Sequence, residues 1–306
     1  MALVGCGRIA ERGWVPALRR VAEAQLVAVA DPVQSRCAAL APGVAAYRGA
    51  ALLAAETAVD LAVVATPAAL HLQDARSFAE RGIAVLVEKP PAETLHDAEA
   101  LARLEPQPWI GFNRRFVPEV AALRDALGAA SGPFALELEL TTVPRSWGAY
   151  AAADGPLHDL GVHLVDLACW LTESRVQRVR AVGPVGESSA FLLETANGSA
   201  RVSVSHRRGW RELVRVRDGG GRTVGSYRAG GPAARVGGRV RPSRESPLVP
   251  SLAAQLRAAL AVLAGREGPA PASAGDGLHV MAALAAVERS AGAGGEWVDV
   301  PTVGLP

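Results

Sequence analysis

Residues 2–10 read ALVGCGRIA, a short apolar run followed at once by a glycine-rich loop and the start of a predicted helix. Gly5 permits a tight turn, Gly7 lets the backbone approach a pyrophosphate, and Ala10 is small enough for close contact between helix and strand. The helix N-terminus adds amide donors and the positive end of the helix dipole. The pattern predicts a dinucleotide-binding loop. Its predicted cofactor contacts are Gly5, Gly7, Arg8, Ile9 and Ala10.

Asp31 stands at the end of the second predicted strand, at about the twenty-residue spacing that such loops show. A carboxylate at this position accepts hydrogen bonds from both ribose hydroxyls and repels a 2′-phosphate. Asp31 therefore favours NAD as the cofactor, with NADP as the alternative. The competing interpretation of the loop is a glycine turn that serves packing only.

The first third of the chain alternates apolar runs with amphipathic stretches. The runs typical of strands cover 2–4, 26–30, 61–64, 84–87 and 109–111. Helical patterns lie between them, at about 8–24, 33–41, 49–56, 69–81 and 94–104. Unbroken apolar strands separated by helices are typical of a parallel sheet buried on both faces. The sequence predicts an α/β fold in which residues 1–118 form a doubly wound Rossmann domain.

Beyond about residue 120, consecutive strands are joined by short turns. Residues 134–140 alternate apolar and polar side chains, and further strands are predicted near 177–182, 189–195, 199–206, 211–217 and 223–228. This order favours a mainly antiparallel, open sheet. Helices are predicted near 118–128, 159–171, 250–264 and 276–291. Together they predict an α+β substrate-binding and oligomerisation domain over 119–306, with 229–247 as a long surface loop.

The chain contains thirty-one arginines and a single lysine, Lys89. The two residue types are not interchangeable where an ammonium must sit half-buried and pass a proton, because a guanidinium stays charged. Lys89 follows a predicted strand, and Pro90 favours an extended backbone there. Glu88 beside it is expected to orient the lysine or its neighbours. The alternative is the chance survival of one surface lysine.

Other polar residues follow neighbouring strands at the same carboxyl edge, where ligands bind in such folds. Thr66 and Pro67 close one strand, and His71 lies either on a helix surface or near the nicotinamide. Asn113 and Arg114 follow the last strand and are predicted to line the substrate cleft. A simple salt bridge is the alternative role for the arginine.

Asp159 and His163 share one stripe of a predicted helix, one turn apart. A carboxylate in this position favours the charged imidazole and raises its pKa, which suits the histidine to general acid–base work. The alternative is that Asp159 is only an N-cap and His163 a core histidine.

These motifs together resemble the Gfo/Idh/MocA family, named for glucose–fructose oxidoreductase and inositol dehydrogenase. The resemblance spans the chain and rests on GCGRIA, Asp31, TP followed by His71, EKP, GFNRRF, DLGVHLVDLACWL and the tail that begins at Asp276. It implies NAD(P)-dependent hydride transfer at a secondary alcohol or ketone of a sugar, cyclitol or related polyol. In such enzymes the EKP lysine contacts cofactor ribose and substrate, the histidine exchanges the hydroxyl proton, and the aspartate positions the histidine.

Carried onto this sequence, the resemblance implies that Lys89, His163 and Asp159 are catalytic and contact the substrate. It also implies a homodimer or homotetramer, because relatives cover the open sheet face with a second subunit. Two features depart from the family. The first strand is expected to be short, and residues 155–158 replace a glycine cluster, which is expected to reshape the substrate pocket.

Two rival functions stay open. One is an NADPH-dependent ketosugar reductase, with a nucleotide-linked sugar as one substrate class. The other is a cofactor-binding regulator without catalysis, against which the retention of all three catalytic residues argues. Residues 201–244 hold twelve arginines and two acids. They form either a solvated sheet face or subunit rim, or a site for a phosphate-bearing substrate.

Composition excludes several classes of protein. The net charge of +2 gives no global attraction to nucleic acid, and no apolar run reaches the length of about 18 residues that a membrane span requires. Three scattered cysteines without close spacing argue against a disulfide framework and a structural zinc site, so we expect no metal. A reducing cytoplasm fits this cysteine usage.

Overall fold

The computed structural model describes residues 1–144, 155–231, 235–236, 239–240 and 246–302. Contacts divide the chain into two compact units. The first contains Met1–Phe116 and Leu248–Met281, and the second contains Val117–Pro247 and the segment that begins at Ala282. The sequence placed all of 119–306 in the second domain, whereas Leu248–Met281 packs with the first. The reason is helix α8 (Leu248–Leu263), which contributes apolar side chains to the core of the first unit.

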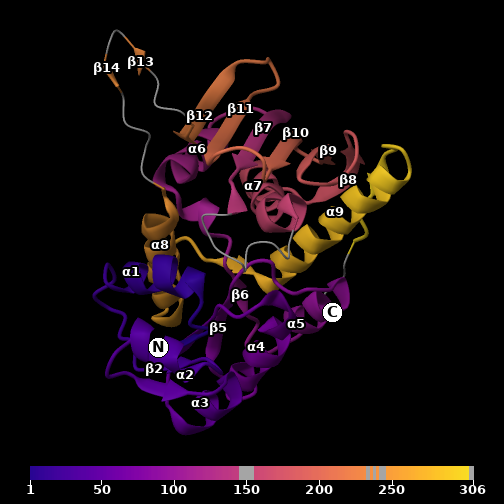
Figure 1. Ribbon diagram of the computed structural model, residues 1–306. Helices are drawn as coiled ribbons and strands as arrows, with labels where there is room; N and C mark the ends of the chain where they lie inside the picture. The colour runs from indigo at the N-terminus through magenta and orange to yellow at the C-terminus, as the bar shows by residue number, and fades with distance from the viewer. Residues whose placement is uncertain (145–154, 232–234, 237–238, 241–245, 303–306) are drawn as a thin grey trace. The chain divides into compact units, whose positions relative to one another are not determined.

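The first unit contains a sheet with the strand order β15-β6-β5-β4-β1-β2-β3. Figure 1 labels β2, β5 and β6 of this sheet. Its parallel strands are β1 (Ala2–Val4), β2 (Ala28–Ala30), β3 (Ala45–Tyr47), β4 (Leu61–Val64), β5 (Ala84–Val87) and β6 (Trp109–Ile110). Strand β15 (Ala272–Ser273) adds an antiparallel edge. The sequence did not predict β3 or β15, because three and two residues are too short to show a pattern.

Helices cover both faces of this sheet. They are α1 (Val15–Leu18), α2 (Gln34–Leu40), α3 (Ala50–Glu56), α4 (His71–Ala79), α5 (Leu95–Ala102) and α8. Helix α1 packs against α8, and α4 packs against α3 and α5. Every residue of β1, β2 and β4 is therefore buried. The predicted doubly wound fold is confirmed.

The second unit contains a sheet with the strand order β12-β11-β7-β10-β9-β8-β16. Its strands are β7 (Phe134–Thr141), β8 (Val176–Ala181), β9 (Ser188–Thr195), β10 (Gly198–Ser205), β11 (Arg211–Arg217), β12 (Thr223–Gly230) and β16 (Val298–Asp299). All neighbours are antiparallel except β7 and β10, so the expectation of a mainly antiparallel sheet is confirmed.

Helices of the second unit are α6 (Pro118–Gly128), α7 (Val162–Thr172) and the later part of α9 (Ala274–Gly292). The expected surface loop at 229–247 is not a plain loop. Strand β12 extends to Gly230, and β13 (Arg235–Val236) pairs with β14 (Arg239–Val240). The predicted loop also includes 232–234, 237–238 and 241–245, which lie outside the described residues.

Arginines of this sheet pair with acids on neighbouring strands. Arg215 contacts Glu137 at 2.5 Å, and Arg211 lies 3.5 Å from Glu139. Strand β7, which carries both glutamates, lies next to β11, which carries both arginines. Because opposite charges face each other across the strands, this part of the arginine-rich stretch is neutralised locally. The pairing favours the interpretation as a solvated sheet face or subunit rim over that as a phosphate site.

Within the described ranges, no helix combines the length and the hydropathy that a bilayer crossing would need. The same ranges contain no group of three or more His, Cys, Asp and Glu side chains that could hold a metal ion.

Candidate functional site

The glycine-rich loop connects β1 to the first helical segment and has the backbone that the sequence predicted. Gly5 has a φ of +91°, and a Cβ there would lie 2.6 Å from the carbonyl oxygen of Ala65. A Cβ at Gly7 would meet nothing within 4 Å. The first position thus requires glycine for close chain packing, whereas the second leaves open space above the backbone. Open backbone at a helix N-terminus is what a pyrophosphate needs.

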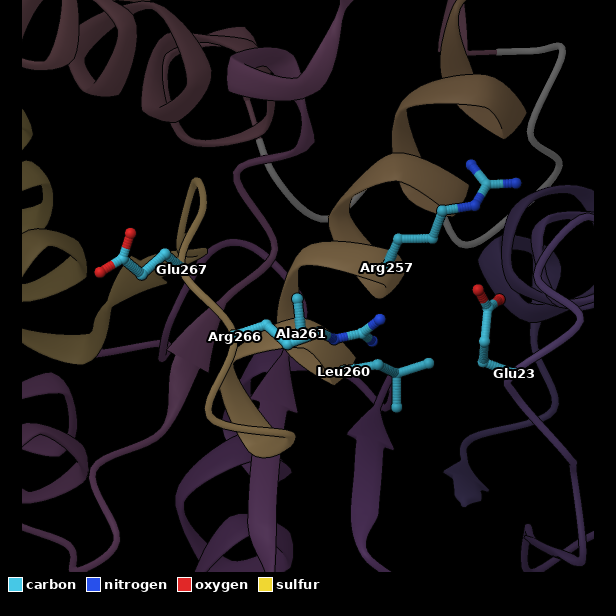
Figure 2. A pocket seen from close by; sticks show the side chains of 6 residues that line it. All are labelled: Glu23, Arg257, Leu260, Ala261, Arg266 and Glu267. Carbon is cyan, nitrogen blue, oxygen red and sulfur yellow. The ribbon is translucent and has the colours of Figure 1, made fainter.

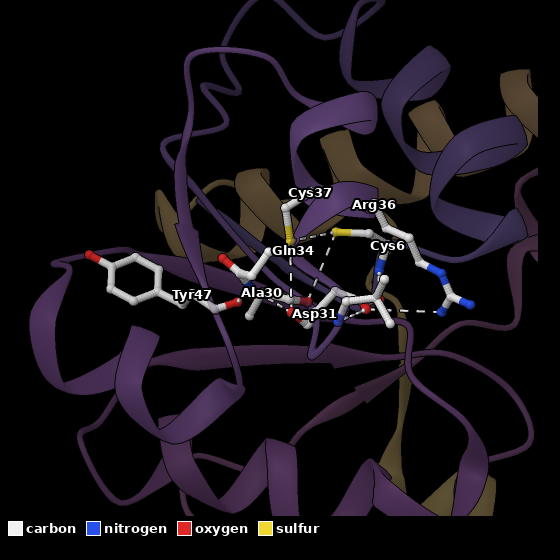
Figure 3. Close-up of polar contacts among 8 residues, drawn as sticks. Cys6, Ala30, Asp31, Gln34, Arg36, Cys37 and Tyr47 are labelled. Atoms are coloured by element: carbon white, nitrogen blue, oxygen red, sulfur yellow. Dashed lines mark hydrogen bonds and ion pairs between the residues drawn. The ribbon is translucent and has the colours of Figure 1, made fainter.

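Asp31 is held rigidly beside this loop (Figure 3). Its Oδ2 accepts a hydrogen bond from the backbone N–H of Cys6 at 2.9 Å, and its Oδ1 accepts one from Val33 at 2.8 Å. The residue is 6% exposed, and Nη1 of Arg36 lies 3.9 Å from Oδ1. Two amide donors on opposite sides fix the direction of the carboxylate. A fixed negative charge at the end of β2 suits ribose hydroxyls and repels a 2′-phosphate.

The cysteine of the loop is not arranged as a nucleophile. The Sγ atoms of Cys6 and Cys37 lie 3.6 Å apart, and both residues are buried. Burial raises the pKa of the Cys6 thiol, and the contact with Cys37 raises it further. The thiol therefore stays protonated, and the reactive thiolate is disfavoured.

Glu88 anchors the backbone of Lys89 at the end of β5. Oε1 of Glu88 accepts a hydrogen bond from the indole N–H of Trp14 at 2.8 Å, and Oε2 accepts one from the Lys89 backbone N–H at 3.1 Å. Burial raises the pKa of Glu88, while the charge of Lys89 and the bond from Trp14 oppose this shift. Lys89 itself is half-buried, as expected. Trp14 was missed, since 74 residues separate it from its partner.

His71 ties the ends of β4 and β5 together and does not lie on a helix surface, because it is only 1% exposed. Its Nε2 lies 2.8 Å from the carbonyl oxygen of Thr66, and its Nδ1 lies 2.9 Å from that of Pro90. Burial lowers the pKa of the ring, opposed by the carbonyl contacts. The ring is therefore neutral and donates from one nitrogen at a time. With both nitrogens facing backbone carbonyls, His71 holds the loop that carries Lys89.

The hydroxyl of Thr66 is hydrogen-bonded to a carboxylate on α4. Its hydroxyl donates to Oδ2 of Asp74 at 2.8 Å, and burial raises the pKa of that carboxyl against the effect of this bond. Pro67 follows as the N-cap of a short 3₁₀ turn at Ala68–Leu70. Both residues lie at the carboxyl edge, where the sequence placed them.

Asn113 and Arg114 lie in a 3₁₀ turn, Asn113–Phe116, directly beyond β6. The side-chain amide of Asn113 donates to the hydroxyl of Ser251 at 2.9 Å, and both residues are buried. This contact fastens α8 and competes with the predicted substrate role of the asparagine. Arg114 is half-buried, and the neighbouring Arg115 lies 3.4 Å from Asp276.

In the second unit, Asp159 and His163 lie on consecutive helical segments. Asp159 belongs to a π-helical turn, Leu157–Gly161, which continues directly into α7 with the buried His163. Neither segment has a side-chain cap, so Asp159 is not an N-cap. Oδ2 of Asp159 lies 3.1 Å from Nε2 of His206, at the end of β10. His206 was not among the predicted site residues; its place at the end of a predicted strand was the only local signal.

Two hollows lie elsewhere on the chain. One of about 270 Å³ at the end of α8 is lined by Glu23, Arg257, Leu260, Ala261, Arg266 and Glu267 (Figure 2). The other, of about 560 Å³, is lined by residues of α6, α7 and the adjoining turns. Neither contains a predicted site residue. They are therefore not part of the candidate site.

Two family models match this chain. The model described as an oxidoreductase family with an NAD-binding Rossmann fold covers residues 1–107, and the GFO/IDH/MocA C-terminal domain covers residues 136–216. The glycine loop and Asp31 lie inside the first match, and Asp159, His163 and His206 lie inside the second.

Relatives with known names agree with these matches. The rhizopine catabolism protein MocA of Rhizobium meliloti is 34% identical over 183 residues, 56% of each chain. An inositol 2-dehydrogenase of the same species is 28% identical, covering 67% of this chain and 68% of the relative. A relative from Amycolatopsis mediterranei is matched over 51% of its length. The chain thus spans about half the length of the first relatives it matches.

Solved structures share the fold over the whole length. The myo-inositol dehydrogenase of Lactobacillus casei, solved with NAD(H) and myo-inositol, has a TM-score of 0.81 at 18% identity and covers 100% of this chain and 97% of its own. An oxidoreductase domain protein from Kribbella flavida has a TM-score of 0.80 at 20% identity and covers 98% of both chains. At this identity the likeness shows the fold alone.

Proposed function

The chain belongs to the Gfo/Idh/MocA oxidoreductase family, and from this premise we propose that it transfers a hydride between a nicotinamide cofactor and a secondary alcohol or ketone of a sugar, cyclitol or related polyol. The observation that carries the proposal is the carboxyl edge of the first sheet. There the open glycine loop, the fixed carboxylate of Asp31 and the half-buried Lys89 follow the strands β1, β2 and β5.

The residues of the first unit fit NAD. The open backbone at Gly7 and the following helix N-terminus suit the pyrophosphate, and Asp31 suits the ribose hydroxyls. Arg8, Ile9 and Ala10 continue the loop. The bound nicotinamide supplies the hydride acceptor or donor. Lys89 contributes a compact ammonium toward ribose and substrate oxygen, while Glu88 and His71 fix its backbone.

In the second unit, we assign proton exchange with the substrate hydroxyl to His163 and the orientation of that ring to Asp159. A neutral imidazole accepts the proton when the alcohol is oxidised and returns it when the ketone is reduced. The same pair therefore serves both directions. Relatives named inositol 2-dehydrogenase and D-apiose dehydrogenase support a polyhydroxylated substrate.

We further propose that the protein forms a homodimer or homotetramer through the open sheet face of the second unit. The face carries the cross-strand pairs Arg215–Glu137 and Arg211–Glu139. Mixed charges can meet a second copy with opposite signs opposed. Three free cysteines support a reducing compartment, the cytoplasm.

A turnover panel tests the proposed function. The protein is incubated with inositols, aldoses, ketoses and nucleotide-linked sugars, each with NAD(H) and with NADP(H), and reduced nicotinamide is followed by absorbance. We expect turnover of a polyol with NAD(H). Lys89→Arg should lower it at least about 10²-fold, because a guanidinium is neither compact nor titratable. Arg81→Lys, at an exposed position in the turn after α4, is the control and should not change the rate.

The panel also separates the rival functions. Turnover of only nucleotide-linked ketosugars with NADPH would replace the polyol assignment by that of a biosynthetic reductase. Tight cofactor binding without turnover of any substrate would identify a regulator. Activity in Lys89→Arg close to that of the unmodified protein would remove Lys89 from the mechanism.

A further inference from the structure

His206 is the better-buried member of its pair with Asp159. The His206 side chain is 10% exposed and that of Asp159 is 30% exposed. The backbone N–H of His206 donates to the carbonyl oxygen of Glu187 at 2.9 Å. The next residue is held as well, since Arg207 N–H donates to the hydroxyl of Ser205 at 3.1 Å. The imidazole therefore projects from an anchored strand end, and it is the fixed partner of the two.

Asp159 is held by a contact from another element of the second unit. The turn Leu157–Gly161 is π-helical and lacks a side-chain cap. Such turns are wider than an α-helix and are frequent at functional sites. With Oδ2 directed at His206, rotation of the carboxylate is restrained from outside the helix. The carboxylate is thereby tied to the residue that follows β10.

A second histidine–carboxylate pair on the same turn provides a contrast. Nε2 of His158 lies 2.9 Å from Oε1 of Glu288, with exposures of 32% and 48%. This pair is similar in chemistry and distance, but it is solvated. Exposed pairs contribute little, because water screens them and both side chains keep their freedom.

We propose that His206 is a positioning residue for Asp159, which holds the carboxylate in the orientation that His163 requires. His206 does not touch the substrate in this scheme and acts only through Asp159. The inference rests on the proposed function for its catalytic consequence. The contact itself does not depend on that function.

Two substitutions at His206 test the positioning role, because their side chains differ in length. The bond uses Nε2, so His206→Gln places an amide donor at a similar distance from the backbone, whereas His206→Asn is shorter and does not reach Asp159. We expect His206→Asn to lower kcat by up to about 10²-fold, with little change in cofactor affinity. His206→Gln should recover most of kcat. His96→Asn, at an exposed position of α5, is the control and should leave kcat unchanged.

A histidine ring ¹⁵N–¹H correlation spectrum tests the contact without turnover. Asp159→Asn should move the Nε2 signal of His206 and leave that of His158 in place. Circular dichroism confirms that each variant is folded, and if His206→Asn is not folded, His206→Gln and the spectrum of Asp159→Asn carry the test.

Equal kcat values in His206→Gln and His206→Asn would overturn the assignment. So would an Nε2 signal of His206 that does not shift in Asp159→Asn. Loss of cofactor binding together with kcat in His206→Asn would also overturn it, since a general structural role would then explain the effect. Absence of turnover in the unmodified protein, with the spectral response present, would refute the proposed function and the catalytic role while leaving the contact established.

Discussion

The hydrogen bond from Trp14 to Glu88 should stabilise the fold by an amount that depends on the charge of the carboxylate. Trp14 is fully buried, and its indole N–H lies 2.8 Å from Oε1 of Glu88. Trp14→Phe removes the donor and leaves a buried carboxylate oxygen. A hydrogen bond to a charged group contributes about 1.5–3 kcal/mol, and one between neutral groups about 0.5–1.5 kcal/mol. The loss should therefore be larger when Glu88 is ionised.

A double-mutant cycle with Glu88→Gln isolates this bond. Trp14→Phe also removes ring volume, but the same volume is lost in both backgrounds and cancels. At mildly alkaline pH, which favours the ionised carboxylate despite its raised pKa, Trp14→Phe should cost about 1 kcal/mol more in the presence of Glu88 than of glutamine. Urea unfolding is followed by circular dichroism and by fluorescence. The free energy of unfolding is taken from a two-state fit where the transitions recorded by the two probes coincide.

Equal costs in the two backgrounds, to within about 0.5 kcal/mol, would refute the reasoning. The bond would then contribute no charge-assisted stability, and Glu88 would hold Lys89 without help from Trp14. A cost in the Glu88 background that persists unchanged at acid pH would have the same meaning, because protonation removes the charge on which the difference depends.

Three further results are expected. Asp31→Ser should narrow the preference for NAD(H) over NADP(H) in binding titrations, since the fixed negative charge is lost; tighter NADP(H) binding by the unmodified protein would show that another group, such as Arg36, reads the phosphate. Burial raises the pKa of Glu88, so the folded state binds the carboxyl proton more readily than the unfolded state does. The free energy of unfolding therefore falls as pH rises from the ordinary glutamate pKa, about 4.3, to the raised pKa of the folded state. Glu88→Gln should remove that slope in urea unfolding at several pH values, and an unchanged slope would assign it to other groups. Light scattering at micromolar concentration should give the mass of a dimer or tetramer, and a monomer mass would contradict the proposed assembly.

Local patterns were sufficient to predict the glycine loop and the strands β1, β2, β4, β5 and β6 of the first sheet. The strands β1, β2 and β4 are buried on both faces, so their sequences are unbroken apolar runs that composition alone reveals. Gly5 could be predicted because its φ of +91° and its contact with Ala65 require the absence of a side chain. In such cases the physical cause lies within a few residues of the effect.

Contacts that join distant segments could not be predicted. Trp14 and Glu88 are 74 residues apart, and Asp159 and His206 are 47 apart. Each residue alone is an ordinary member of a helix or strand end. The helical pattern at 250–264 predicted α8 itself, but amphipathic spacing does not say which core receives the apolar side. The bond from Asn113 to Ser251 could not be predicted for the same reason, since it needs the position of α8.

The return of α8 to the first unit has a consequence for how the chain matures on the ribosome. Leu252, Leu256 and Ala259 share one core with Leu3 and Trp14, which are synthesised well before them. At roughly 5–20 residues per second, the intervening Val117–Pro247 take on the order of ten seconds to translate. Throughout that interval the nascent nucleotide-binding domain lacks the helix that covers one side of its core. A later-made helix therefore completes an earlier-made domain, and a nascent chain that stalls before α8 leaves apolar surface open to chaperones or to aggregation.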